Sequence, residues 1–166
     1  MSSARFWHFW MGVAFLVLYL LGKQRQIEGR ILMHPLGLAL LIPATYLGTV
    51  LPDWDIKLLG IGAHRNPIFH SAIPYFLAAL LWRLAGGNRV IQSPLTIRLM
   101  AGAQVGFVLG LCSHLVLDIF QYGDVRWLSG DTFGKLWLAI HSVLLALVAW
   151  FPQYARHSTC SFRSTQ

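Results

Sequence analysis

Acidic and imidazole side chains recur in three short segments of an otherwise apolar sequence. The segments "LPDWD", "HRNPIFHS" and "SHLVLDIF" supply Asp53, Asp55, His64, His70, His114 and Asp118. His114 and Asp118 are four residues apart, which puts both on one face of a helix. Carboxylates and neutral imidazoles suit Zn²⁺, Mn²⁺ or Fe²⁺. The three segments therefore indicate a divalent metal site.

The composition is that of a membrane protein. Of 166 residues, 56% are hydrophobic and 11% charged, against about 25% charged in soluble domains, and the mean hydropathy is +0.58. The net charge of +7 does not indicate nucleic-acid binding, because Lys and Arg fall singly at the ends of apolar runs, as in membrane proteins. We expect one transmembrane helical domain over residues 1–155 and a short polar tail over 156–166.

Five apolar runs predict an all-α, multi-pass bundle of about five helices. They cover residues 6–21, 31–51, 68–85, 95–120 and 136–151. A spanning helix needs roughly 17–25 residues, so the second to fourth runs are long enough, and the first and last need their flanks. We interpret the first run as a retained helix rather than a signal peptide, because "GKQ" after it is a poor cleavage site.

If all five runs span, the polar residues gather on one side. We call the side that holds the N-terminus face A and the other side face B. Face B receives eight of the 13 Lys and Arg residues, so the positive-inside rule makes it cytoplasmic. Five of the six acids and five of the seven histidines lie toward face A. We therefore expect an integral protein of a bacterial inner membrane or its equivalent, with a polar site on the non-cytoplasmic face.

Local signals place these side chains at helix ends. Pro52 ends the second run just before the aspartate pair. Asn66 followed by Pro67 predicts a helix start, with Asn as the N-cap and Pro in the first position. His64 would then precede this helix, and His70 would lie in about its first turn.

Three glycines lead up to the His114 and Asp118 pair. Gly102, Gly106 and Gly110 have a four-residue spacing, and small residues so spaced let transmembrane helices approach closely. At about 100° per residue, Gly110 shares a helix face with both ionisable residues. The pair is therefore predicted to face the interior of the bundle.

The three segments resemble, in order and approximate spacing, the LPDxDH, HRGxTHS and SHxxxD motifs of the LexA-binding, inner membrane-associated hydrolases. The resemblance covers residues 8 to about 128 and implies a membrane-bound, metal-dependent hydrolase. It also implies metal-binding or catalytic roles for the six residues of the motifs, and it matches His8 to an early histidine of that family. The chain departs from the pattern at Ile56, where the family often has histidine, and by one extra residue between His64 and His70.

The favoured function is hydrolysis of an ester or phosphoester by a metal-activated water. Zinc is the expected ion, with manganese or iron as alternatives, in one or two copies. The expected ligands are His8, Asp53, Asp55, His64, His70, His114 and Asp118, and the expected catalytic residues are Asp53, Asp55 and His64. The expected partners are membrane lipids and a small or lipid-like substrate, with no nucleic acid, and the oligomeric state stays open.

Other interpretations remain. The cluster could be a structural metal or ion-pair site in a protein without catalysis. Proton or metal transport ranks last, because residues 36–51 and 75–81 contain no charged residue or histidine. Individually, Asp53 and Asp55 could cap a turn, His141 is expected to be structural, and Ser71 and Ser113 are expected to bond back to helix carbonyls.

Overall fold

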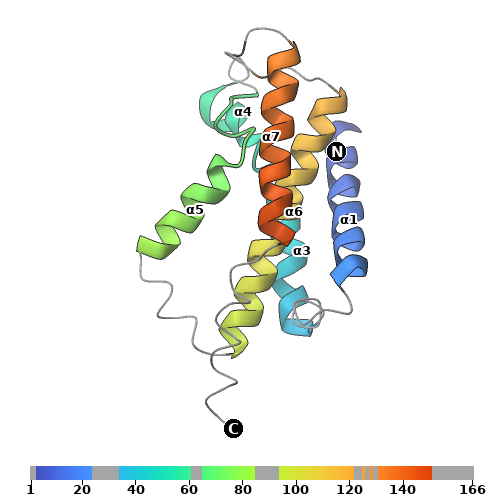
Figure 1. The fold of residues 1–166 in the computed structure, drawn as a ribbon, viewed down its shortest axis with the longest axis vertical. Helices are drawn as coiled ribbons and strands as arrows, with labels where there is room; N and C mark the ends of the chain where they lie inside the picture. Colours follow the sequence, from blue (N-terminus) through green and yellow to red (C-terminus); the bar gives the residue numbers. More distant parts are fainter. Residues whose placement is uncertain are drawn as a thin grey trace.

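The structure, a computed structural model, describes residues 3–23, 34–60, 65–84, 94–121, 125, 128 and 131–150. Within these ranges the chain is all-helical, as predicted, and has no strand. The six helices are α1 (Ser3–Lys23), α3 (Pro35–Val50), α4 (Trp54–Leu59), α5 (Ile73–Leu84), α6 (Pro94–Gln121) and α7 (Asp131–Trp150) (Figure 1). The expected tail, 156–166, and His64 lie outside the described residues.

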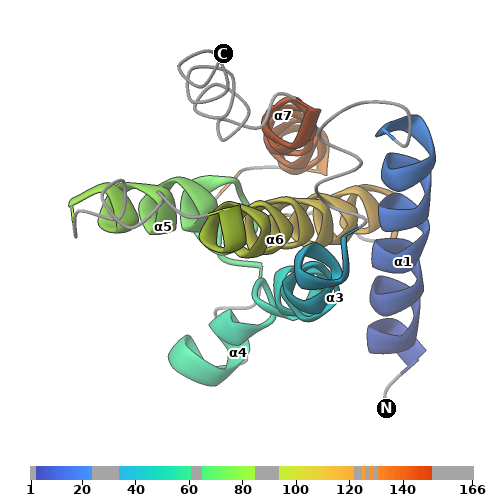
Figure 2. The same cartoon turned by 90° about the horizontal axis from the view of Figure 1, so that it is seen from below.

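The chain runs back and forth between two ends of the bundle. The first residues of α1, α5 and α7 and the last residues of α3 and α6 lie toward the same end, at the top of Figure 1. The short helix α4 projects sideways at this end (Figure 2). This is the predicted alternation, so we keep the names face-A end for this end and face-B end for the opposite one.

Among the described residues, three helices are long and apolar enough to cross a membrane. These are the stretches Phe6–Lys23, Arg98–Gln121 and Asp131–Trp150. The second and third apolar runs form shorter helices than expected, with 16 residues in α3 and 12 in α5. The helix α3 begins where Pro35 occupies its first position, and the chain turns at Leu51 and Pro52. The third run begins as a turn over residues 67–72, which shortens α5.

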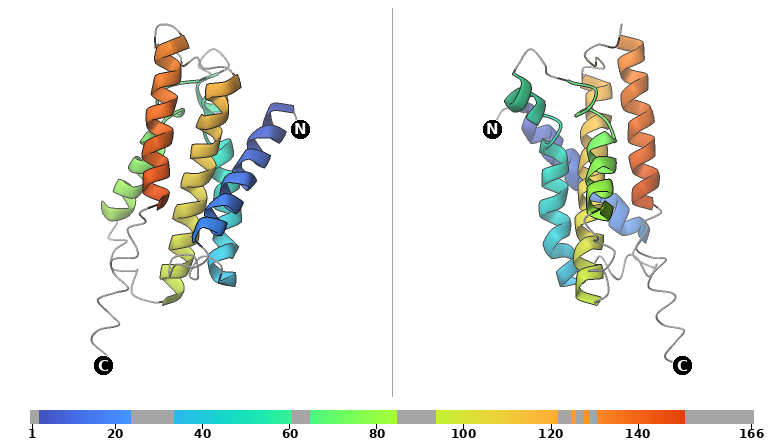
Figure 3. Two further views of the ribbon diagram at one scale, coloured as in Figure 1. Left: turned by 45° about the vertical axis from the view of Figure 1, so that its right-hand side comes forward. Right: turned by 90° about the vertical axis from the view of Figure 1, so that its left-hand side faces the viewer.

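The helix α6 is central and packs against α3, α7 and α1. Figure 3 shows α3 and α6 side by side along most of their length. A Cβ atom at Gly102, Gly106 or Gly110 would overlap a carbonyl oxygen of α3, namely that of Gly37, Leu41 or Thr45. The predicted role of these glycines in close helix packing is confirmed.

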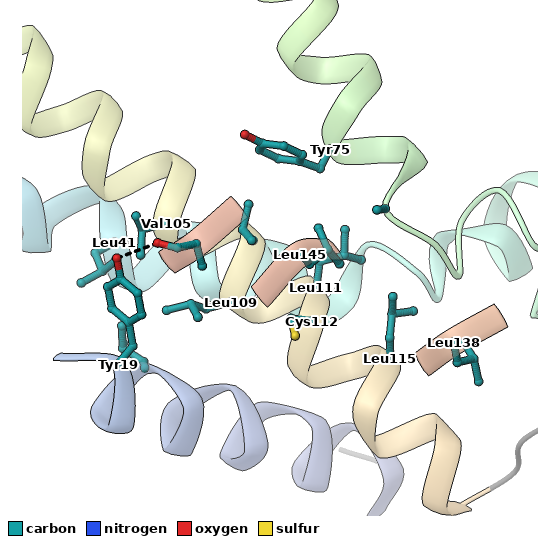
Figure 4. Packing of buried hydrophobic residues seen from close by; sticks show 14 of the residues in the cluster. Tyr19, Leu41, Tyr75, Val105, Leu109, Leu111, Cys112, Leu115, Leu138 and Leu145 are labelled. Carbon is teal, nitrogen blue, oxygen red and sulfur yellow. Dashed lines mark hydrogen bonds between the residues drawn. The ribbon is translucent and has the colours of Figure 1, made fainter. Parts of the chain in front are cut away.

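Large aliphatic side chains fill the space between the helices. The fully buried ones include Leu41, Leu111, Leu115, Leu138 and Leu145, all labelled in Figure 4. Toward the face-B end, the Tyr19 hydroxyl donates a hydrogen bond to the Ala149 carbonyl at 2.8 Å, and Lys23 Nζ donates to the Trp150 carbonyl at 3.1 Å. These two bonds join α1 to the last turn of α7.

The helix α5 leaves the bundle after its first turn (Figures 1 and 2). Tyr75 is buried, and its hydroxyl accepts a hydrogen bond from Gln104 Nε2 at 2.9 Å. Residues 76–82 are all exposed. The turn before α5 is therefore held at the face-A end by local contacts rather than by packing along the whole helix.

Candidate metal centre

The centre is built on α6, where His114 and Asp118 lie one turn apart. Both are buried, with 0% and 3% of their surface exposed, as the glycine pattern predicted. His114 Nε2 lies 3.4 Å from Asp118 Oδ2. His114 Nδ1 lies 2.7 Å from the Thr49 carbonyl oxygen. Because a carbonyl only accepts, Nδ1 carries the proton, and the Nε2 lone pair faces the centre.

His70 approaches the same carboxylate from the turn before α5. Its Nε2 atom lies 3.4 Å from Asp118 Oδ2, and its side chain is 1% exposed. One carboxylate oxygen therefore has two imidazole nitrogens at 3.4 Å. Ligands about 2.0–2.1 Å from a tetrahedral ion lie about 3.3–3.4 Å apart, so each of the two nitrogens lies from this oxygen at the distance that separates two ligands of one ion.

Two further side chains border this group. The His8 ring, from α1, stacks on the His114 ring with centroids 4.0 Å apart, and His8 Nε2 lies 3.8 Å from Asp118 Oδ1. Asp53 Oδ1 lies 3.9 Å from His114 Nε2. Two sets of donor atoms lie within 4.8 Å of one another, one from His8, His114 and Asp118 and one from Asp53, His70 and His114.

The two aspartates of "LPDWD" occupy different places. Asp53 is the N-cap residue of α4, but its side chain makes no capping hydrogen bond. Instead its carboxylate, 27% exposed, faces His114. Asp55 is fully buried behind His70, with Oδ2 3.4 Å from His70 Nδ1 and accepting a hydrogen bond from Asn66 N at 3.0 Å. Asp55 thus contacts the side of His70 that faces away from Asp118.

The predicted helix start at Asn66 is wrong. Asn66 Oδ1 accepts a hydrogen bond from Ile68 N at 2.9 Å, so this side chain closes a turn rather than capping a helix. The His70 amide donates to the Asn66 carbonyl at 2.9 Å. The helix begins only at Ile73, whose amide donates to Ser71 Oγ at 3.1 Å. His70 therefore belongs to the turn and not to the helix.

Sequence reasoning missed two groups that hold the centre. One is the Thr49 carbonyl, a main-chain atom near the end of α3 that has no sequence signature. The other is Trp137 in α7, whose Nε1 donates to the His70 carbonyl at 3.0 Å.

Ser71, Ser113 and His141 lie near the centre without belonging to it. The Ser113 hydroxyl donates to the Gly110 carbonyl of α6 at 2.8 Å, as expected. The Ser71 hydroxyl donates to the Ile68 carbonyl at 2.7 Å, which belongs to the turn before α5 rather than to a helix. The His141 ring contacts the Trp137 ring in a tilted arrangement, with centroids 4.2 Å apart and 59° between the ring planes. It belongs to neither set of clustered donor atoms among the described residues.

The charges of the cluster fit a divalent cation. Asp53, Asp55 and Asp118 face three imidazoles, and neutral imidazoles would leave the carboxylates uncompensated. A buried charge is costly unless it is paired or bound, by roughly 2.5–3.5 kcal/mol on insertion scales at the middle of a spanning helix and by less toward its ends. Within the described part of the chain, His114 Nε2 and Asp118 Oδ2 have no hydrogen-bond partner. These two buried atoms, an imidazole nitrogen and a carboxylate oxygen, are of the types that bind zinc, and they face each other at 3.4 Å, the distance between two ligands of one ion.

Comparison with known proteins assigns the chain to a family of membrane proteins. No curated protein and no solved structure matches the chain. The sequence model of the YdjM inner membrane protein family matches residues 4–129, more than half of the chain and the whole of the cluster. Together with three helices long enough to span, this makes the protein an integral membrane protein. The chain belongs to the YdjM inner membrane protein family.

Proposed function

We propose that this protein is a membrane-bound, metal-dependent hydrolase whose ion is held by His70, His114 and Asp118. The observation that carries the proposal is Asp118 Oδ2, which lies 3.4 Å from the Nε2 atoms of both histidines. The resemblance of the three motifs to the LexA-binding, inner membrane-associated hydrolases supports the same chemistry. Zinc is the proposed ion, because two imidazoles and one carboxylate are a common catalytic zinc set.

One ion is proposed rather than two. Both sets of clustered donor atoms include His114, and its Nδ1 is committed to the Thr49 carbonyl. The single lone pair on Nε2 can bind one ion. His8 and Asp53, at 3.8 and 3.9 Å from members of the trio, border the site and leave its fourth coordination position to water.

Asp53 and Asp55 have different proposed roles. When bound in such a site, a divalent ion acidifies a water ligand and polarises the ester or phosphoester. Asp53 is the proposed general base, because its carboxylate is 27% exposed while the other paired carboxylate and imidazole side chains at the centre are at most 7% exposed. Water can therefore reach the centre from the side of Asp53. Asp55 holds His70 in place rather than reacting.

The position of the centre at the ends of the spanning helices favours an amphiphilic substrate. The reacting group would lie at the membrane interface while an apolar part stays in the lipid. The proposed substrate is therefore a lipid-like ester or phosphoester.

A structural cluster is the second candidate. The same contacts connect α1, α4, α6 and the turn before α5, so an ion could serve only to join them. We do not propose transport, because the buried residues of α6 between the two ends are apolar or small, from Ala101 to Cys112.

The test is metal content and hydrolysis in protein purified in detergent without chelators. We expect about one bound ion per chain and hydrolysis of bis(p-nitrophenyl) phosphate or p-nitrophenyl esters, both lost in His114→Ala and Asp118→Asn. His34→Ala, at the face-B end, is the matched control and should keep both. A wild-type protein without metal would overturn the proposal, and bound metal without turnover of either substrate class would favour the structural cluster.

A further inference from the structure

His70 is the one proposed ligand that no helix holds. His114 and Asp118 belong to α6, whose backbone is fixed by its own hydrogen bonds and by the close contact with α3. His70 lies in the turn over residues 67–72, and the helix after this turn diverges from the bundle (Figure 1). The position of its imidazole therefore depends on the contacts of the turn itself.

Three contacts hold His70 from different directions. Its amide donates to the Asn66 carbonyl at 2.9 Å, and its Nδ1 atom faces Asp55 Oδ2 at 3.4 Å. Asn66 is also tied to Asp55, whose Oδ2 atom accepts the Asn66 amide hydrogen at 3.0 Å. The third contact comes from another part of the chain, because the His70 carbonyl accepts a hydrogen bond from Trp137 Nε1 at 3.0 Å.

Trp137 is well placed to act as a fixed point. It lies two turns into α7, where it packs against the buried apolar core. The ring of His141, one helical turn further along α7, contacts the Trp137 ring at a tilt of 59°, with centroids 4.2 Å apart. An indole has few rotatable bonds and a single donor, so its hydrogen bond has a defined direction.

We propose that Trp137 is a positioning residue of the metal centre, which holds His70 at ligand distance from outside the ligand set. This inference rests on the proposed function. It gives α7 a role in the centre, although no α7 side chain belongs to the clustered donor atoms among the described residues. Partners of a ligand that do not touch the ion typically change metal affinity 10–100-fold.

The test is Trp137→Phe, which keeps an aromatic ring and removes the donor. We expect Zn²⁺ affinity, measured by competition with a chromophoric chelator, to fall about 10-fold. The visible absorption spectrum of the Co²⁺-loaded protein should change, because His70 shifts relative to the ion. The melting temperature of the metal-free protein should stay close to that of Trp150→Phe, the control on the same helix. Trp137→Leu, which also lacks a donor, carries the same expectation if Trp137→Phe does not accumulate in the membrane.

A double mutant separates positioning from general packing. His70→Ala lacks one ligand, so its weaker Zn²⁺ binding is measured by titration at raised Zn²⁺ concentration, and in this background Trp137→Phe should cause no further loss of affinity. An equal loss in both backgrounds, or an unchanged affinity and Co²⁺ spectrum in the single variant, would overturn the inference while the hydrolase proposal stands. A wild-type protein that binds no metal would overturn both.

Discussion

The imidazole rings of His8 and His114 lie nearly parallel, with centroids 4.0 Å apart and 10° between their planes. Two protonated rings at this distance would repel each other, so the stack favours at least one neutral ring. His114 is the ring whose Nδ1 hydrogen is already used by the Thr49 carbonyl. The stack also shows that α1 encloses one side of the centre, since its residue His8 is 6% exposed and faces Asp118.

The two stacked histidines should therefore differ in their effect on metal binding. His114→Ala removes a proposed ligand, and we expect stoichiometric metal to be lost. His8→Ala removes a bordering ring, and we expect Zn²⁺ affinity to fall about 10-fold with metal still bound at saturation. Chelator competition measures both. Equal losses in the two variants would show that His8 is a ligand of the same rank as His114.

Substitutions of the two buried aspartates, Asp55 and Asp118, should also differ in their effect on metal affinity. Asp55→Asn keeps an oxygen for the Asn66 amide but removes the negative charge beside His70 Nδ1. We expect metal affinity to fall about 10–100-fold, whereas Asp118→Asn should abolish binding. Asp131→Asn, at the exposed start of α7, is the control and should change nothing. Full retention of affinity in Asp55→Asn would contradict the positioning role of this carboxylate.

The sequence predicted the helical class, the alternation between two faces and most of the acidic and imidazole residues that lie together at the face-A end, because these follow from strong local signals. Apolar runs mark helices, and the four-residue spacing from Gly102 to Asp118 defines one helix face. That face does carry both the glycine contact with α3 and the His114 and Asp118 pair.

What the sequence could not predict depends on geometry between segments. Asn66 followed by Pro67 is equally compatible with a helix cap and with the side-chain turn that forms. The roles of Asp53 and Asp55 differ because one faces His114 and the other lies behind His70, which a spacing of two residues does not reveal. Trp137 is brought to His70 by tertiary packing alone.

The glycine contact should support both stability and metal binding. In Gly110→Ala, the new Cβ would overlap the Thr45 carbonyl and lie 3.0 Å from Thr49 N, so α3 must move. We expect a loss of about 1–3 kcal/mol in the free energy of unfolding and weaker metal binding, because the Thr49 carbonyl shifts away from His114. Denaturation by SDS and chelator competition measure these effects.

Gly22→Ala is the matched control for this substitution. The nearest atoms to a Cβ there are those of the Trp150 ring, at 3.8 Å, which is an ordinary contact. We expect no loss of stability and no change in metal affinity. If Gly110→Ala were as stable as Gly22→Ala, this result would contradict the close approach of α3 to α6 at Gly110.

The orientation in the membrane can be tested with single cysteines. Lys57 is exposed in α4 at the face-A end, and Leu95 is exposed near the start of α6 at the face-B end. In a Cys160→Ser background, where Cys112 is buried, we expect a membrane-impermeant maleimide to label Lys57→Cys in intact spheroplasts. Leu95→Cys should react only after permeabilisation. The reverse pattern would place the centre on the cytoplasmic face.

Removal of the metal should lower the stability of the whole bundle. An ion that binds only the folded chain adds about 2.7 kcal/mol at a free concentration 100 times its Kd, and here it would connect α6 to the turn before α5. We therefore expect the melting temperature of the detergent-solubilised wild type to fall on dialysis against EDTA and to recover with Zn²⁺. His114→Ala should melt at the same temperature with and without EDTA. His34→Ala loses the N-cap hydrogen bond of α3 and should melt at a lower temperature than the wild type, but EDTA should lower its melting temperature as it does that of the wild type. A wild-type melting temperature that does not respond to EDTA or Zn²⁺ would argue against an ion at this centre, because the carboxylates would then be balanced by protonated histidines alone.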